Sequence, residues 1–110
     1  MAIPKRFRKF QSDYPHVAEA YDRLGNAVHT AGPLTDRERA LVKLAISVGA
    51  RLEGGMHAHT RKALMAGVTK QDLYHVALLS MQTIGLPSAM AAMSAIDDIL
   101  EERPKKKRAK

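Results

Sequence analysis

The chain has 110 residues, a length typical of one domain, and 45% of them are hydrophobic. Large side chains are scarce, with two Phe, three Tyr and no Trp, so Ala, Leu, Val and Met must fill the interior. This composition favours packed helices over a β-sandwich. The absence of Cys excludes disulfides, thiolate nucleophiles and Cys-ligated metal sites, and it is compatible with the cytoplasmic location that we expect.

The formal charge of +7 is concentrated at the two ends of the chain. Residues 1–10 carry four Lys or Arg and residues 103–110 carry six, whereas residues 11–100 carry eight basic and nine acidic groups, a net charge of −1. We therefore predict a basic N-terminal segment at residues 1–11, a helical domain at 12–102 and a basic, disordered tail at 103–110. The alternative for the tail is weak binding of a polyanion such as nucleic acid.

No apolar run reaches the roughly 20 residues that a membrane span requires, so no membrane partner is expected.

Hydrophobic periodicity predicts an all-α protein of about five helices. The first helix is expected over residues 12–31, where apolar residues recur at steps of three and four, and Gly32-Pro33 ends it. Its stripe consists of Phe10, Tyr14, Val17, Tyr21, Leu24, Val28 and Ala31. The second helix is expected over residues 36–50, after a capping box formed by Thr35 and Glu38. Its apolar side includes Leu41, Leu44, Ala45, Val48 and Leu52, with Arg39, Lys43 and Ser47 opposite.

The third and fourth helices are separated by Gly67. The third is expected over residues 54–66 and the fourth from Thr69 to about Gly85, with Asp72 in a second capping-box position. The fourth helix is apolar around almost its whole circumference, which is typical of a helix buried on every side. A small domain buries only part of its surface, so we favour a homo-oligomer; the alternative is a central helix surrounded by the other four.

The fifth helix is expected to follow Pro87 and to end near Glu102, because Pro104 comes two residues later.

Chemistry is expected in the third helix, which a glycine pair opens. His59 lies at the edge of the apolar side that Met56 and Ala63 form. Such an imidazole can act as a general acid–base, or it can be a core histidine whose nitrogens are hydrogen-bonded. His57 points about 200° away from His59 on a helix, which argues against a shared metal, and no metal is expected. The free N–H groups after Gly55 can hold a carboxylate.

Three segments of the chain resemble the carboxymuconolactone decarboxylase family, which shares its fold with the alkylhydroperoxidase D-like proteins. They are the runs from Leu34 to Val42, from His59 to Thr69 and from Ile84 to Ala89. The resemblance implies an all-helical fold that assembles as trimers or hexamers. In the peroxidase branch, a Cys-x-x-Cys pair would occupy Leu52 and Gly55.

The peroxidase branch also has a proton-relay Glu, whose position here is Ala40. Thiol–disulfide exchange needs a thiolate, so we expect no peroxidase activity and no cofactor. The resemblance to the decarboxylase branch implies an acid–base decarboxylation or lactone isomerisation of a small carboxylic acid. We assign proton transfer to His59, with Glu53 as its partner or as a second acid–base, and substrate binding to His57, Arg61 and Gly55. The alternative for Glu53 is an acid that only stabilises the first turn of the helix. The alternative is a non-catalytic scaffold or binding protein of the same fold.

Overall fold

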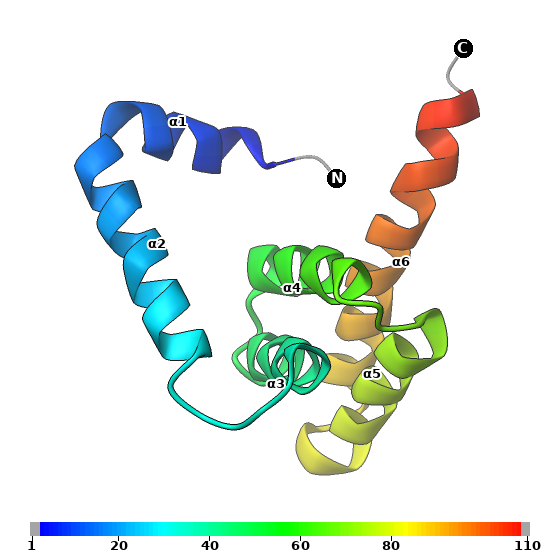
Figure 1. Ribbon diagram of the computed structural model, residues 1–110. Coiled ribbons are helices and arrows are strands. Elements are labelled where there is room, and N and C mark those ends of the chain that lie inside the picture. The colour runs from blue at the N-terminus through cyan, green and yellow to red at the C-terminus, as the bar shows by residue number, and fades with distance from the viewer. Residues whose placement is uncertain (1–2, 109–110) are drawn as a thin grey trace. The chain divides into compact units, whose positions relative to one another are not determined.

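The computed structural model describes residues 3–108, and the side chains as far as residue 102, as six α-helices without a strand (Figure 1). Two compact units divide the chain at Leu34, with two helices in the first unit and four in the second. The bounds are α1 (Lys5–Asp13), α2 (Pro15–His29), α3 (Asp36–Gly49), α4 (Glu53–Met65), α5 (Lys70–Ile84) and α6 (Leu86–Arg108). The all-α prediction is confirmed, with six helices instead of about five.

None of the helices within residues 3–108 is long and apolar enough to cross a lipid bilayer.

The first unit differs from the single helix expected over residues 12–31, because the chain forms two helices that meet at Tyr14. Tyr14 has φ −133° and ψ 65°, outside the helical region, and Pro15 takes the first position of α2. A proline disfavours the helical conformation of the residue before it, while its own fixed φ suits a helix start. The residues of the predicted apolar stripe are exposed along α2, where Ala18 is the buried residue.

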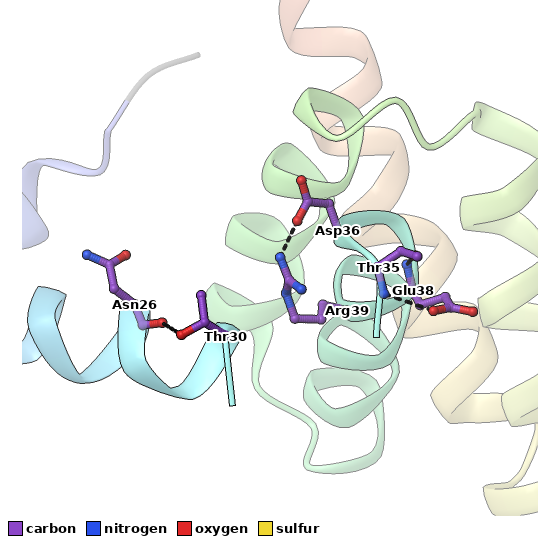
Figure 2. A network of polar contacts seen from close by, with 6 residues as sticks. All are labelled: Asn26, Thr30, Thr35, Asp36, Glu38 and Arg39. Carbon is purple, nitrogen blue, oxygen red and sulfur yellow. Dashed lines mark hydrogen bonds and ion pairs between the residues drawn. The ribbon is translucent and has the colours of Figure 1, made fainter. Parts of the chain in front are cut away.

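Helix α3 begins at the predicted capping box (Figure 2). The Glu38 backbone N–H donates to Thr35 Oγ1 at 3.1 Å, and the Thr35 backbone N–H donates to Glu38 Oε1 at 2.9 Å. Asp36 and Arg39 form an ion pair in the same turn. These bonds satisfy donors that would otherwise lack a partner, and they hold the pKa of the Glu38 carboxyl below its usual value. The capping box is therefore confirmed.

The boundaries of α4 and α5 follow the local signals that the sequence carries. Gly67 adopts φ +86° after α4, a left-handed conformation that favours glycine. Thr69 and Asp72 then form the second capping box, with bonds of 3.1 and 2.9 Å. The prediction for this box is confirmed, and the start of α5 is thereby defined.

Helix α6 extends to Arg108, past the predicted end near Glu102. Pro104 removes one backbone donor, but a proline does not prevent the residues after it from adopting helical dihedral angles. The expected basic tail at residues 103–110 lies outside the described side chains.

The start of α6 is joined to the loop before α4. The Arg51 guanidinium in this loop donates a hydrogen bond of 2.9 Å to Oγ of the buried Ser88, in the first turn of α6.

The core of the second unit lies where α3, α4, α5 and α6 meet. Its buried members are mostly small or aliphatic side chains, as the composition predicts: Leu44, Val48, Met56, Ala63, Val68, Leu73, Ala77, Ala92, Ala95 and Ile96. Helix α5 contributes Leu73 and Ala77 to this core, whereas its Leu78 and Leu79 are exposed. Helix α5 is therefore not a central helix enclosed by the others, and part of its apolar surface remains uncovered in the single chain.

Ser47 was expected on the solvent side of its helix, but it is 3% exposed and packs against α4. A Cβ atom added at Gly55 would lie 3.2 Å from the Ser47 Cβ and 3.2 Å from the Leu52 Cβ. The missing side chain of Gly55 lets α4 approach α3 closely, so a side of α3 that reads as polar in the sequence becomes an interhelical contact.

The glycine pair provides a matched test of this close packing. Nothing lies within 4 Å of a Cβ added at Gly54, so Gly54→Leu is expected to raise the free energy of unfolding by up to about 1 kcal/mol through helix propensity. Gly55→Leu is expected to lower it by about 1–3 kcal/mol, because the side chain must separate α3 from α4. Urea unfolding of both variants measures these changes. Equal effects at the two positions would contradict the close contact.

Candidate active site on helix α4

Helix α4 presents a buried side between two partly exposed flanks. Met56, Thr60 and Ala63 are each at most 4% exposed and face the core. His57 and His59 are both half-buried, but they lie on opposite edges of this buried side because successive helical residues are rotated by about 100°. The two histidines therefore belong to different environments, as the sequence predicted.

The first flank of α4 faces α6 and carries two of the predicted substrate-binding residues. His57 Nε2 lies 2.9 Å from Asp98 Oδ2, and Arg61 donates to Glu102 Oε2 at 3.3 Å. The two contacts are one helical turn apart on both helices. In this structure His57 and Arg61 brace α4 against α6, and each is already paired with a carboxylate.

The second flank of α4 faces α3 and carries His59. Gly55 contacts Ser47 on this flank, as described above. Helices α3 and α4 are joined by a short loop, and neighbours joined in this way are antiparallel as a rule. We therefore infer that Lys43 and His59, one turn further along each helix from Ser47 and Gly55, also lie at the contact between the two helices. The geometry thus assigns His59 to the α3 side and His57 to the α6 side. Gly55 serves helix packing there.

Cationic side chains gather around this second flank. The pKa of the Lys43 ammonium is lowered, first because burial disfavours its charged form and then because the charges of Lys62 and Arg39 repel it. Lys62 follows His59 by three residues, on the same side of α4. The α3–α4 flank therefore combines an imidazole with two lysines, and with Arg39, whose guanidinium is already paired with Asp36. Two ammonium groups beside an imidazole are suited to holding an anion near a proton-transfer group.

Glu53 is the first residue of α4, where the sequence placed it just before the helix. Its side chain is exposed. Six residues separate it from His59 on one helix, so the two side chains leave the axis about 120° apart and about 9 Å apart along it. This position fits the alternative interpretation of Glu53 as an acid that stabilises the first turn of the helix.

A cleft of about 530 Å³ lies elsewhere, between α3 and α5. Its walls are mainly apolar, and none of the five predicted site residues lines it. At one end Arg37 and Asp72 form an ion pair of 2.8 Å. The pKa of the Asp72 carboxyl is lowered by its hydrogen bonds with Thr69 and by Arg37. Those bonds cap α5, so the charge of Asp72 is structural.

The sequence-based interpretation missed Lys43 as a candidate site residue. Its position opposite the apolar stripe of α3 indicated a solvent-facing lysine. The available signal was Gly55, because a glycine inside a helix often marks close approach of another backbone. Within the described side chains, no three His, Asp or Glu converge into a group that could hold a metal ion.

We compared the sequence and the structure of the chain with those of known protein families and solved structures. Residues 15–98 match the Carboxymuconolactone decarboxylase family. A crystal structure of an apo carboxymuconolactone decarboxylase family protein from Legionella pneumophila is similar, with a TM-score of 0.71 and 21% identity, over 86% of this chain and 87% of that one. This likeness shows the fold alone.

An uncharacterised protein of Haemophilus influenzae is 33% identical over 61 residues, which are 56% of this chain and 54% of that protein. The chain thus spans about half the length of this relative. The family match is broader, because residues 15–98 run from the start of α2 well into α6 and include the whole of α4. The chain therefore belongs to the carboxymuconolactone decarboxylase family, as a member that contains no cysteine.

Proposed function

We propose that the protein is a lyase that decarboxylates, or isomerises, a small lactone carrying carboxylate groups, by acid–base chemistry at His59. Helical spacing carries this proposal, because it assigns His59 to the side of α4 that faces α3, where Lys43 lies close enough to Lys62 and Arg39 for their charges to lower its pKa. Family membership supports the same reaction class. The absence of Cys leaves no thiolate for peroxidase chemistry.

The proposed residues divide the reaction between binding and proton transfer. When the bond to the departing CO₂ breaks, its electron pair moves into the ring and forms a dienolate. A proton must then reach a ring carbon, and His59 is proposed to deliver it as an imidazolium. A second carboxylate of the substrate is proposed to bind the Lys43 and Lys62 ammonium groups, whose mutual repulsion an anion would relieve.

Lys43→Met tests the binding half of this proposal. Methionine keeps the length and apolar stem of lysine but removes its charge, so we expect KM for a carboxylated muconolactone to rise about tenfold or more, with little change in kcat. The matched control is Lys70→Met, an exposed lysine at the start of α5. Steady-state kinetics of CO₂ release measure both. An unchanged KM in the Lys43 variant would remove this residue from the binding site.

A non-catalytic binding or scaffold role is the second candidate function. It is favoured by the position of the apolar cleft between α3 and α5, away from His59. For either function we propose a cytoplasmic homo-oligomer of three or six copies, supported by the exposed apolar side chains Leu78 and Leu79 on α5. Weak polyanion binding through residues 103–110 also remains a proposal, and a salt titration of nucleic-acid binding would test it.

A further inference from the structure

The turn between α3 and α4 has an unusual backbone conformation at Arg51. The Arg51 N–H donates to the Val48 carbonyl at 3.1 Å, and the Leu52 N–H donates to the Ser47 carbonyl at 3.0 Å. With Ala50 as the C-cap of α3, these two bonds form a Schellman motif, in which the residue after the cap adopts a left-handed conformation. Arg51 accordingly has φ 60°, although glycine is usual at this position because a Cβ atom makes the conformation costly.

The chain carries a side chain at a position of this turn where glycine would be less costly. In the described part of the chain, the other two residues with positive φ are both glycines, Gly67 and Gly85. Gly49 and Gly54 lie within a few residues of Arg51, but neither of them has a positive φ. Strained residues persist only where the surrounding structure holds them, and they cluster at functional sites. The strain at Arg51 therefore points to a role for its side chain.

The Arg51 side chain links the turn to a helix that is distant in the sequence. Its guanidinium donates to Ser88 Oγ at 2.9 Å, and Ser88 is 3% exposed in the first turn of α6. A cation at the N-terminus of a helix opposes the helix dipole, so stability alone does not favour this contact. Arg51 thus bears two unfavourable contributions, one from its backbone and one from the dipole, while it joins the turn between α3 and α4 to α6.

The same turn sets the start of α4. The Leu52 carbonyl accepts a hydrogen bond from the Met56 N–H at 2.7 Å, and the Leu52 Cβ lies 3.2 Å from the position of a Cβ added at Gly55. Gly55 is also the point of close approach to Ser47 of α3, and His59 lies one turn further along α4 on the same side. The direction in which α4 leaves the turn therefore determines how His59 lies against α3.

We propose that Arg51 is a positioning residue, which through its bond to Ser88 holds the first turn of α4 and thereby the placement of His59 against α3. This role rests on the proposed function of His59, because Arg51 acts through that side chain and not on the substrate. A displacement of about 1 Å at a reacting group can lower a rate by up to about a hundredfold, so the link matters although Arg51 precedes His59 by eight residues.

Hydrogen exchange measures the link without any substrate. Arg51→Gly and Ser88→Ala each remove the bond between guanidinium and hydroxyl, so we expect the Leu52 and Met56 amides to exchange about tenfold faster in both variants, relative to the amides of α5. The double variant is expected to exchange no faster than the faster single variant, because both substitutions break the same bond. Ser94→Ala is the matched control, since it makes the same substitution at an exposed serine of α6. Unchanged exchange in both single variants, or additive effects in the double variant, would overturn the proposal.

Kinetics test whether the link positions the proton-transfer group. Arg51→Gly is expected to lower kcat for decarboxylation of a carboxylated muconolactone about tenfold with little change in KM, because the binding lysines remain in place. Its urea midpoint is expected not to fall, because glycine relieves the left-handed strain and so compensates for the lost bond. An unchanged kcat, or a loss of kcat that only follows a fall in the folded fraction, would make Arg51 a purely structural contact and overturn the proposal. If the unmodified protein shows no turnover, the proposed function fails, and hydrogen exchange alone decides whether Arg51 holds α4.

Discussion

Replacing His59 with Gln is expected to lower kcat for decarboxylation of a carboxylated muconolactone by about a hundredfold or more. Glutamine has a similar size and can still form hydrogen bonds, but it cannot take up and release a proton near neutral pH. General acid–base catalysis typically contributes a factor of about 10²–10⁴, which defines the expected loss. Substrate binding should change less than kcat, because the cationic groups of the α3–α4 flank remain in place. The rate of CO₂ release under saturating substrate measures the effect.

The control for this experiment is His16→Gln, which removes an exposed histidine from α2. Its turnover is expected to equal that of the unmodified protein. Turnover that survives the loss of His59 would remove this residue from the mechanism and favour the scaffold or binding role. Absence of turnover in the unmodified protein would have the same consequence for this substrate class.

Leu73→Ala is expected to lower the free energy of unfolding by about 2–5 kcal/mol. Leu73 is 0% exposed and belongs to the core in which α3, α4, α5 and α6 meet. Removing three carbon atoms there leaves a cavity that a helical core of small side chains cannot readily fill. Urea unfolding, with the slope m compared between variants, measures the loss.

The matched control is Leu79→Ala, the same substitution on the same helix. Leu79 is 62% exposed in the single chain, so its loss is expected to cost less than about 1 kcal/mol at low protein concentration. A large loss at Leu79 that grows with protein concentration would show that an oligomer contact buries this residue. A small loss at Leu73 would contradict the core described here.

The helix boundaries show which features of the fold can be predicted from residues that are close together in the sequence. The capping boxes at Thr35 and Thr69 and the end of a helix at Gly67 were predicted correctly, because each depends on neighbours within four residues. Tyr14 was placed in the first turn of the helix expected over residues 12–31, whereas in the structure it lies outside the helical region and α2 begins at Pro15. The start of α2 was therefore predicted to within a few residues, but the separate helix α1 before it was not.

The candidate site was predictable only in part. The position of His59 at the edge of an apolar helix side was predicted, because helical periodicity alone indicates which residues share a side. Lys43 was missed, because its approach to α4 depends on the contact between Ser47 and Gly55 on different helices. Glu53 was assigned beside His59, but both lie on one helix, and rotation along α4 separates their side chains.

The sequence by itself determined the all-α class, the starts of α3 and α5, and the family, since these follow from composition and from residues adjacent in the chain. Only the tertiary structure decided that His57 and Arg61 pair with Asp98 and Glu102 of α6, and that α4 packs closely on α3. The physical reason is that helical periodicity defines which residues share a side of one helix. The helix that covers this side is chosen by packing among segments distant in the chain.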